Sequence, residues 1–484
     1  MKTRKRNFNF KRELWLILGL AVVSGLLYMA WDSPLKALPF YRVKDGFNLN
    51  PLPRDVNAGS PLFKMQRPGD SLPEFRLTIE PEFMASLLAG RPQEKTCLRT
   101  RFKKVPVKAF SINGATIGGK AFARLRGLCH LHWLYKQKSI KVQIEKPFLG
   151  YSTFNLTTLN SDAFLFEIWA NRLLVEAGGI ASRVVLVKVY LNDEYLGVHE
   201  LVENLDKDLL ANQGLRPGPM YREKYFAEFG NSMEIEKIED YWQKNAAKSS
   251  NWEDLIALQK AVLQSVQTGD DSYKSHLNLD QYITYSAVAA LTGTNHLNTH
   301  NIPIYRPKRD PRFSFIGYDF YEPQASGQST PLLPFHMPYL AMNRLHRLFM
   351  ADPALRAMVH KRIAYIIRHN DPVGLYEKIL AHARPYLTED LPKGIISHGN
   401  GIPSIEKYES ANWHFPTVQR RIEYLKEDYE NPEARITPGW REKESFQFVI
   451  QGAGMYRVRF QTAASCDKDP DFTVKILGRT IAPP

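Results

Sequence analysis

The chain has 484 residues, of which 44% are hydrophobic and 24% charged. This composition is typical of a folded globular protein and argues against a largely disordered one. The formal net charge is +14, but six Lys or Arg residues fall in the first twelve positions, where there is no acid. Because the remainder carries only one short basic loop, RPKRDPR, we do not expect a nucleic-acid partner.

An apolar segment follows the basic tail of residues 1–12. Residues 14–31 contain no charged side chain and would span roughly 27 Å as a helix, close to a hydrocarbon core about 30 Å thick. YMA and LKA both have a large residue at position −3 of a cleavage site, so we favour a transmembrane signal anchor over residues 13–31 to a cleaved signal peptide. The flanking charges place the N-terminus in the cytoplasm and the main domain outside it. The sequence thus predicts a single-pass membrane protein.

Three cysteines, Cys97, Cys129 and Cys466, occur without a C-x-x-C pair. An odd and sparse set argues against a disulfide scaffold and against a structural zinc site. Two interpretations stay open: Cys97 and Cys129 pair in an oxidising compartment, or all three are buried free thiols.

The first half of the chain alternates between linker, strand and helix signals. Residues 32–74 are Pro-rich and predict an extended linker. Alternating apolar and polar residues predict half-buried antiparallel strands. A capped helix ending at Gly178-Gly179 and a hairpin turning at Asn192-Asp193 are expected next. The predicted segments are strands at 105–112, 119–127 and 138–145, a hairpin at 183–203 and a short helix at 207–212.

The second half, from about residue 240 to 430, is expected to be mainly helical. Asp280 and Asp352-Pro353 are typical helix starts, and residues 418–429 predict a late amphipathic helix. Residues 302–320 interrupt these helices with two short strands around the basic loop. Residues 436–484 contain only strand and turn patterns, which indicate a small β-rich C-terminal domain. The whole pattern predicts an α+β protein.

Basic residues follow a glycine-bearing strand end. Arg126 precedes Gly127, and Lys138 and Lys141 enter the next predicted strand. A Lys on such a strand can reach the phosphates of a nucleotide, and a carboxylate from the following hairpin, Glu200 or Glu203, could orient it. The alternative is that the lysines face solvent and the glutamates cap the next helix.

The stretch TNHLNTHNIPIY, residues 294–305, is rich in Asn and His. His296 and His300 would share a helix face and could bind a metal, but Gly293 and the asparagines favour a loop. A loop with a base and an amide ligand, followed by a hairpin and Asp319, is instead the order of parts that holds nucleotide-bound Mg²⁺ in kinases. Loop polar groups that bond their own backbone are the structural alternative.

Five pieces of sequence in order resemble the spore-coat CotH kinase family: RLRG, HWLYKQKS, VYLNDEYLGVHELVENLD, THNIPIY and YDF. The resemblance covers roughly residues 75–430, the expected domain being 75–432. It implies an atypical protein-kinase-like two-lobe fold that binds ATP with Mg²⁺ or Mn²⁺. Carried over by residue, it implies nucleotide contacts from Arg126, Lys138, Lys141 and Glu203, and metal coordination by Asn301 and Asp319.

The chain departs from the family pattern in the catalytic loop. His296, Leu297 and Asn298 stand where an acidic residue is expected, and Tyr321 replaces the second Asp of D-F-D. His296 has the intrinsic basicity to replace the acid, so His296 and Asn298 are the candidate catalytic residues.

Two functions follow from the resemblance and its departures. One is a membrane-anchored kinase that transfers phosphate to Ser or Thr of a surface or envelope protein. The other is a pseudokinase, an inactive scaffold or adhesive envelope-assembly module that has kept the fold.

Overall fold

The computed structural model describes most of residues 71–395 and four short strands beyond them. The described ranges are 71–89, 102–127, 130–159, 165–224, 228–246, 251–292, 302–320, 343–393 and 395. The chain divides into two compact units, residues 1–47 and 48–484, and every described residue belongs to the second. None of the helices in these ranges is long and apolar enough to cross a membrane. The predicted signal anchor, the three cysteines and the predicted helix at 418–429 lie outside them.

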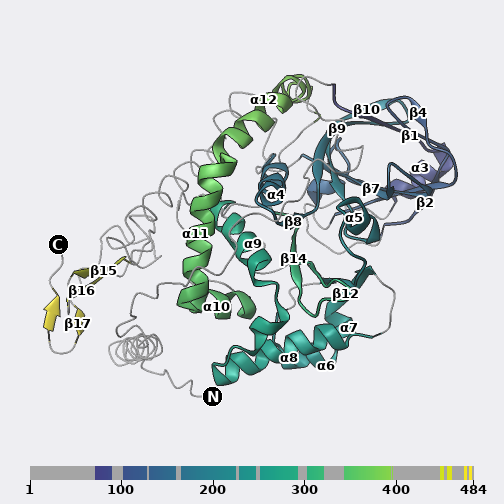
Figure 1. The fold of residues 1–484 in the computed structure, drawn as a ribbon. Helices are drawn as coiled ribbons and strands as arrows, with labels where there is room; N and C mark the ends of the chain where they lie inside the picture. The colour runs from purple at the N-terminus through teal and green to yellow at the C-terminus, as the bar shows by residue number, and fades with distance from the viewer. Residues whose placement is uncertain are drawn as a thin grey trace, which may run out of the picture. The chain divides into compact units, whose positions relative to one another are not determined.

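Nine strands of the described residues form one sheet in the order β2-β5-β6-β7-β10-β9-β1-β3-β4 (Figure 1). Neighbouring strands are antiparallel except β1 and β9, which are parallel. The strands are β1 (Glu74–Thr78), β2 (Val105–Val107), β3 (Ala109–Ile112), β4 (Ala115–Thr116), β5 (Ala121–Leu125), β6 (Ile140–Phe148), β7 (Tyr151–Thr158), β9 (Val184–Leu191) and β10 (Glu194–Glu203). The three predicted segments at 105–112, 119–127 and 138–145 therefore do form strands, although the first is divided into β2 and β3.

The β9–β10 hairpin turns where the sequence predicts it. Asn192 and Asp193 both have positive φ, 50° and 62°, and Leu191 pairs with Glu194 across them. Two consecutive positive φ values define a type I′ turn, which Asn and Asp tolerate better than most residues.

The two faces of this sheet differ in chemistry. On β5, Ala123 and Leu125 are buried, while Arg124 between them points to the other face. Ile140 and Val142 on β6 and Leu156 on β7 join the same apolar cluster. Side chains of a strand alternate between faces, so the residues between these positions form a polar face opposite the core.

A second sheet has the order β12-β11-β13-β14-β8. Its strands are β8 (Ile180–Ala181), β11 (Met220–Glu223), β12 (Trp242–Ala246), β13 (Ile304–Tyr305) and β14 (Ser314–Gly317). The short parallel strand β8 pairs with β14 and is followed in the chain by β9 of the first sheet. The predicted pair of short strands around the basic loop is thus β13 and β14, and within residues 71–395 the described chain is a mixed α+β fold with two sheets.

Helices make up most of the rest of the described chain. They are α3 (Pro81–Leu88), α4 (Phe166–Glu176), α5 (Lys207–Asn212), α6 (Ser232–Glu236), α7 (Ile238–Tyr241), α8 (Glu253–Thr268), α9 (Leu279–Thr292), α10 (Arg344–Ala351), α11 (Pro353–Asn370) and α12 (Pro372–Asp390), with 3-10 turns at His130–His132 (η2) and Ser272–His276 (η3). Every residue of α9 from Gln281 to Thr292 is buried, because α9 packs between α4, α11 and β14 (Figure 1).

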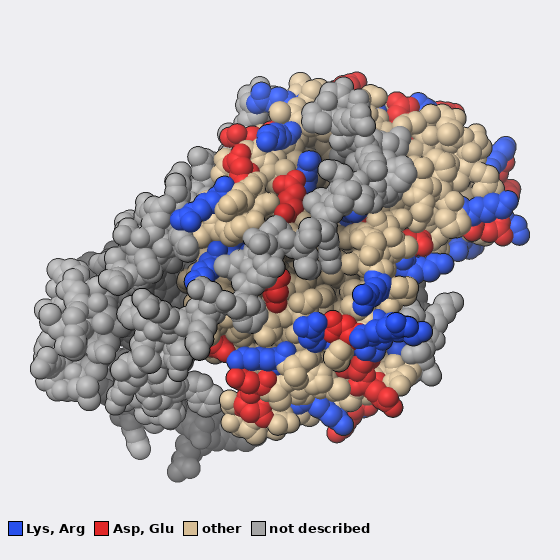
Figure 2. Space-filling model, viewed as in Figure 1, with Lys and Arg blue, Asp and Glu red and all other residues tan. Residues whose placement is uncertain are grey.

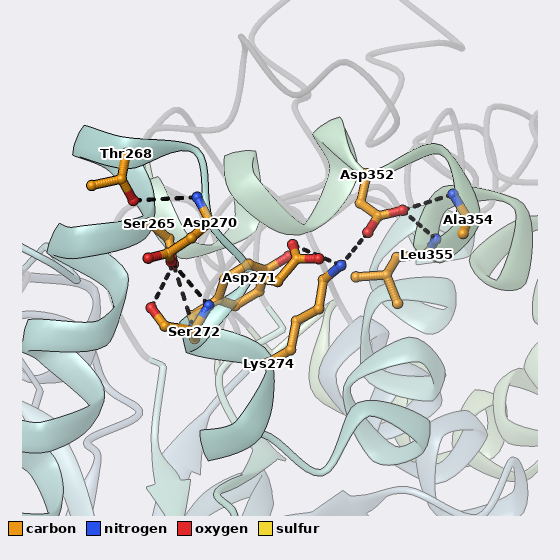
Figure 3. A network of polar contacts seen from close by, with 10 residues as sticks. Ser265, Thr268, Asp270, Asp271, Ser272, Lys274, Asp352, Ala354 and Leu355 are labelled. Carbon is orange, nitrogen blue, oxygen red and sulfur yellow. Dashed lines mark hydrogen bonds and ion pairs between the residues drawn. The ribbon is translucent and has the colours of Figure 1, made fainter.

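A polar network ties η3 to the start of α11 (Figure 3). Lys274 forms ion pairs with Asp271, at 2.8 Å, and with Asp352. Asp352 also accepts hydrogen bonds from the backbone N–H groups of Ala354 and Leu355, and so caps α11. The predicted helix start at Asp352-Pro353 is confirmed, and its cap carries a tertiary contact as well.

Candidate functional site

Cations line the polar face of the nine-stranded sheet. Arg124 pairs in register with Lys141, and Lys141 with Asn155, so the three share that face. Lys141 Nζ donates to Asn204 Oδ1 at 2.9 Å. Burial lowers the pKa of Lys141 to about 8, and the neighbouring Arg126 adds to the effect. Burial, and then the charge of Arg126, also lowers the pKa of Arg124, as expected for cations that are both desolvated and close to one another.

Arg126 lies at the end of β5 and faces the second sheet. Its Nη1 donates to Thr157 Oγ1, and its Nη2 lies 3.3 Å from the Tyr318 hydroxyl. Gly127, the next residue, has a φ of +101°, and a Cβ there would lie 2.1 Å from Cγ of His132. Only glycine fits this position, which explains the R-G pair.

Hydrogen bonds join the segment HWLYKQKS to the sheet beside Arg126. His132 Nδ1 lies 2.9 Å from Ser139 Oγ, which also accepts the Thr158 N–H. Gln137 donates to Val198 O at 2.6 Å and accepts from Leu159 N. Burial, reinforced by Arg126, lowers the pKa of His132 to about 4, although Asp319 opposes this shift. The imidazole is therefore neutral at physiological pH.

Three carboxylates converge on the same region from separate elements. Glu200 on β10 pairs in register with Thr157, and Glu167 on α4 accepts the Asp319 N–H at its Oε1, at 3.1 Å. Burial raises the pKa of Glu200 well above its usual range, the charges of Glu167 and Asp319 raise it further, and Arg126 opposes them. Buried like charges of this kind are common at functional sites.

Arg222 supplies a cation from the second sheet. This β11 residue has its guanidinium carbon 4.8 Å from the Tyr318 ring centre. Burial lowers its pKa, but the combined influence of Tyr318, Glu223 and Asp319 raises it overall. Arg222 also contributes to the lowered pKa of Lys141, so cations from both sheets act on one another.

The structure brings together some of the predicted site residues and separates others. Arg126 and Asp319 both act on His132 and Glu200, and Lys141 lies close enough to Arg126 and Arg222 for both to lower its pKa. Lys138 instead donates from Nζ to Tyr135 O at 2.7 Å. His296, Asn298 and Asn301 lie outside the described residues, so their roles stay predictions.

Glu203 lies on the core face, opposite Lys141. It accepts from the Tyr151 hydroxyl at 3.1 Å and from Gln213 Nε2 at 2.9 Å, and burial raises its pKa to about 7. Glu200, three residues earlier, lies on the polar face because an odd spacing on a strand changes the face. Glu200 therefore shares the polar face with Lys141 and Glu203 does not, and the expected nucleotide-site role of Glu203 stays a prediction.

Four contributors to the site were not singled out from the sequence: Glu167, Arg222, Tyr318 and Glu223. Glu223 accepts the N–H of Ile302, the residue after Asn301, at 2.8 Å. The sequence does mark Glu167 as unusual, because it is a charged residue within the apolar run FLFEIWA. Burial of such a residue needs a reason. The positions of the other three depend on how the two sheets meet.

The residues present suit a divalent cation held together with phosphates. Within the described ranges, no three His, Cys, Asp or Glu side chains are grouped closely enough to hold a metal alone. Mg²⁺ is, however, usually bound by one or two carboxylates plus substrate phosphates. Burial is the main cause of the raised pKa of Glu200, and the charges of Glu167 and Asp319 add to it, so a cation beside Asp319 would offset that added repulsion. The donor set therefore fits.

This concentration of charge is a local feature. On the face shown in Figure 2, basic and acidic side chains of the described residues are interspersed rather than gathered by sign. The site combines Arg and Lys groups suited to bind an anion with carboxylates suited to bind a cation. That pairing is the one an enzyme or binding protein for a metal–phosphate ligand requires.

Comparison with known proteins assigns the chain to a family. The family model described as CotH kinase protein matches residues 123–372, more than half of the chain. The chain belongs to the CotH kinase family. A comparison with curated proteins gives no match.

Among solved structures, a chain of the Shewanella oneidensis MR-1 toxin–antitoxin complex of HipA, HipB and operator DNA is similar to this one. The similarity covers 75% of each chain at 13% identity and a TM-score of 0.32. A TM-score this low supports no conclusion about fold or function.

Proposed function

We propose that this protein is a kinase-like protein that binds ATP with Mg²⁺ or Mn²⁺ and transfers phosphate to Ser or Thr of a surface or envelope protein. The observation that carries the proposal is that Arg126 and Arg222 both contact Tyr318, the residue before Asp319, with Lys141 close to the two arginines, within the residues that match the CotH kinase family. The kinase-like two-lobe arrangement is part of this proposal.

Each group has a defined task in the proposed site. Arg126, Lys141 and Arg222 bind the phosphate oxygens, and Arg is suited to this because its planar fork can donate two parallel hydrogen bonds. The charge of Arg126 opposes the raised pKa of Glu200, as a kinase Lys–Glu pair would. Glu167 accepts the backbone N–H of Asp319 and so holds the backbone from which the Asp319 carboxylate projects.

Asp319 is the proposed metal ligand, with Asn301 as the second. A bound divalent cation would neutralise developing charge on the transferred phosphoryl group. The acceptor proton requires a base, and His296 is the candidate from the sequence. A surface or envelope acceptor is proposed because residues 13–31 are expected to anchor the chain with its main domain outside the cytoplasm.

The second candidate function is a pseudokinase scaffold or adhesive module. The observation that favours it is the absence of an acidic residue at His296, Leu297 and Asn298. In that case the site binds a ligand without transferring a group.

Phosphate transfer by the full-length protein separates these two candidates. The protein is incubated with labelled ATP, Mn²⁺ and candidate envelope proteins, beside Asp319→Asn and the exposed control Arg309→Ala. We expect labelling by the wild type and by Arg309→Ala, and a loss of at least about 100-fold in Asp319→Asn. Metal-dependent ATP binding without phosphate transfer supports the scaffold. A protein that shows no ATP binding and no transfer rejects the proposed function.

A further inference from the structure

Helix α12 joins the two elements that carry the buried glutamates. It begins at Pro372, where the family match ends, and runs to Asp390, a rise of roughly 27 Å. It packs against both α4 and β10, which bear Glu167 and Glu200. In Figure 1 it follows α11 at the top of the view and ends on the side of β9 and β10.

The first turn of α12 holds α4. The indole Nε1 of Trp169 donates to Pro372 O at 2.8 Å. The ring of Tyr376 meets the Trp169 ring edge-on, at 5.8 Å and 90°. Trp169 is fully buried and lies two residues after Glu167, so these contacts fix the turn of α4 that presents the carboxylate.

The last turn of α12 holds β10. Asp390, which is fully buried, accepts the Val198 N–H at Oδ2, at 2.8 Å, and the Tyr195 hydroxyl at 3.2 Å. The strand register shifts between Tyr195 and Gly197, and such a bulge redirects backbone groups of the strand. A buried N–H without an acceptor is costly, so Asp390 completes the bulge.

The bulge also requires glycine at position 197. Gly197 has a φ of +98°, and a Cβ there would lie 2.3 Å from Ile395 Cγ2 and 3.1 Å from Asp390 Oδ2. Gln137, from the segment beside Arg126, donates to Val198 O from the other side. The backbone N–H and C=O of Val198, two residues before Glu200, are thus both hydrogen-bonded to side chains.

We propose that α12 is a strut that fixes the distance between α4 and β10, and that Asp390 is a positioning residue acting through Val198 on Glu200. Trp169 is its counterpart at the other end and acts on Glu167. A packed helix transmits displacement between its two ends because it is far stiffer than a loop. The inference rests on the proposed function only for its nucleotide-binding measurement.

Hydrogen exchange of the full-length protein tests the strut without any ligand. The variants are Asp390→Ala, Asp390→Asn, which keeps an oxygen acceptor for Val198, and the exposed neighbour Glu389→Gln as control. In Asp390→Ala we expect exchange at least about threefold faster in both β10 and α4, with α8 unchanged. Asp390→Asn and Glu389→Gln should match the wild type.

The opposite end provides an independent test should Asp390→Ala fail to fold. Trp169→Phe removes the N–H donor but keeps an aromatic ring, and we expect it to speed exchange at Val198. Faster exchange confined to the altered end in the variants that fold would overturn the strut.

Measuring the affinity for ATP with Mn²⁺ tests whether the strut acts on the site. We expect this affinity to fall about tenfold in Asp390→Ala and to recover in Asp390→Asn. Unchanged affinity in Asp390→Ala contradicts positioning of the site. A wild-type protein that binds no ATP rejects the proposed function instead, and the exchange results still decide whether α12 is a strut.

Discussion

Arg126 and Tyr318 connect the two sheets through a hydrogen bond from the guanidinium Nη2 to the phenol oxygen, at 3.3 Å. Arg126 follows β5 of the nine-stranded sheet, and Tyr318 lies between β14 of the second sheet and Asp319. The same guanidinium also binds Thr157, the register partner of Glu200. One side chain therefore links the proposed phosphate-binding face to the segment with the proposed metal ligand.

Arg126→Lys keeps the charge but loses the fork that reaches both Thr157 and Tyr318. A hydrogen bond to a charged group contributes about 1.5–3 kcal/mol, so we expect ATP affinity to fall roughly 10- to 100-fold. Calorimetric titration with ATP and Mn²⁺ measures this, with Arg309→Lys as the matched control. Equal affinities in the two variants would show that Arg126 has no role in binding.

The charge of Lys141 predicts a pH dependence of nucleotide binding. Burial lowers the pKa of Lys141 to about 8, so the ammonium group is charged below that pH and neutral above it. Affinity for ATP should therefore decrease as the pH rises through about 8. Lys141→Arg, whose guanidinium stays charged, should bind with little change over this interval. A decrease of the same size in the Arg variant would assign the titration to another group.

Gly127→Ala separates steric overlap from backbone strain. Gly127 has a φ of +101° and a Cβ there would overlap His132, whereas Gly114, with a φ of +79°, has open space around its Cβ position. Strain alone costs about 1–3 kcal/mol, and overpacking adds a similar amount. Chemical denaturation should show Gly127→Ala to be less stable than Gly114→Ala by at least about 1 kcal/mol. Similar losses at both sites would mean that the His132 ring moves aside freely.

Asp280 and Arg362 form an ion pair between α9 and α11. The N–O distance is 2.6 Å, and the Arg362 side chain is 1% exposed. Asp280→Ala leaves that buried charge without its partner; because Asp280 itself is 34% exposed, we expect a cost of about 3 kcal/mol, at the low end for a buried pair. The double variant Asp280→Ala/Arg362→Met should be more stable than the single one, because the buried charge is gone. The denaturation midpoints of the single and double variants measure this difference. A double variant no more stable than Asp280→Ala would show that the unpaired charge of Arg362 is not the cause of the loss.

The Lys274–Asp352 contact predicts a loss of stability in acid. Burial would raise the pKa of Asp352, but the hydrogen bond from Lys274 and the two backbone N–H donors lower it overall. Its contribution is therefore complete above the unfolded pKa of about 3.9 and is lost as the pH falls through the lower folded value. Asp352→Ala should cost about 1 kcal/mol near neutral pH from the cap alone. The exposed Glu389→Gln should leave the unfolding curve unchanged, and an equal acid sensitivity in Asp352→Ala and wild type refutes this assignment.

Local signals in the sequence predicted much of the fold. The β9–β10 turn at Asn192-Asp193 and the cap at Asp352 depend on neighbouring residues alone, so both could be recognised without tertiary information. Helix α12 was not singled out, because Gly374 and Pro385 interrupt a helical pattern. Its stability comes from packing against α4, α11 and β10.

Candidate site residues could be proposed from the sequence by type, but their arrangement in space could not. Arg126, Lys141 and Asp319 were identified from motif order, but the choice between Glu200 and Glu203 depends on which strand face meets the second sheet. That choice follows from the register of β7 and β10, which no local pattern contains. Glu167 and Arg222 join the site only through packing between separate elements.

Calorimetric titration of the full-length protein with ATP, in the presence and absence of Mn²⁺, tests the proposed metal–nucleotide site most directly. Binding should require Mn²⁺, should be lost in Asp319→Asn and weakened in Arg126→Lys, and should be unchanged in Arg309→Lys. Binding that is absent from the wild type, or unaffected by Asp319→Asn, would contradict the proposed site.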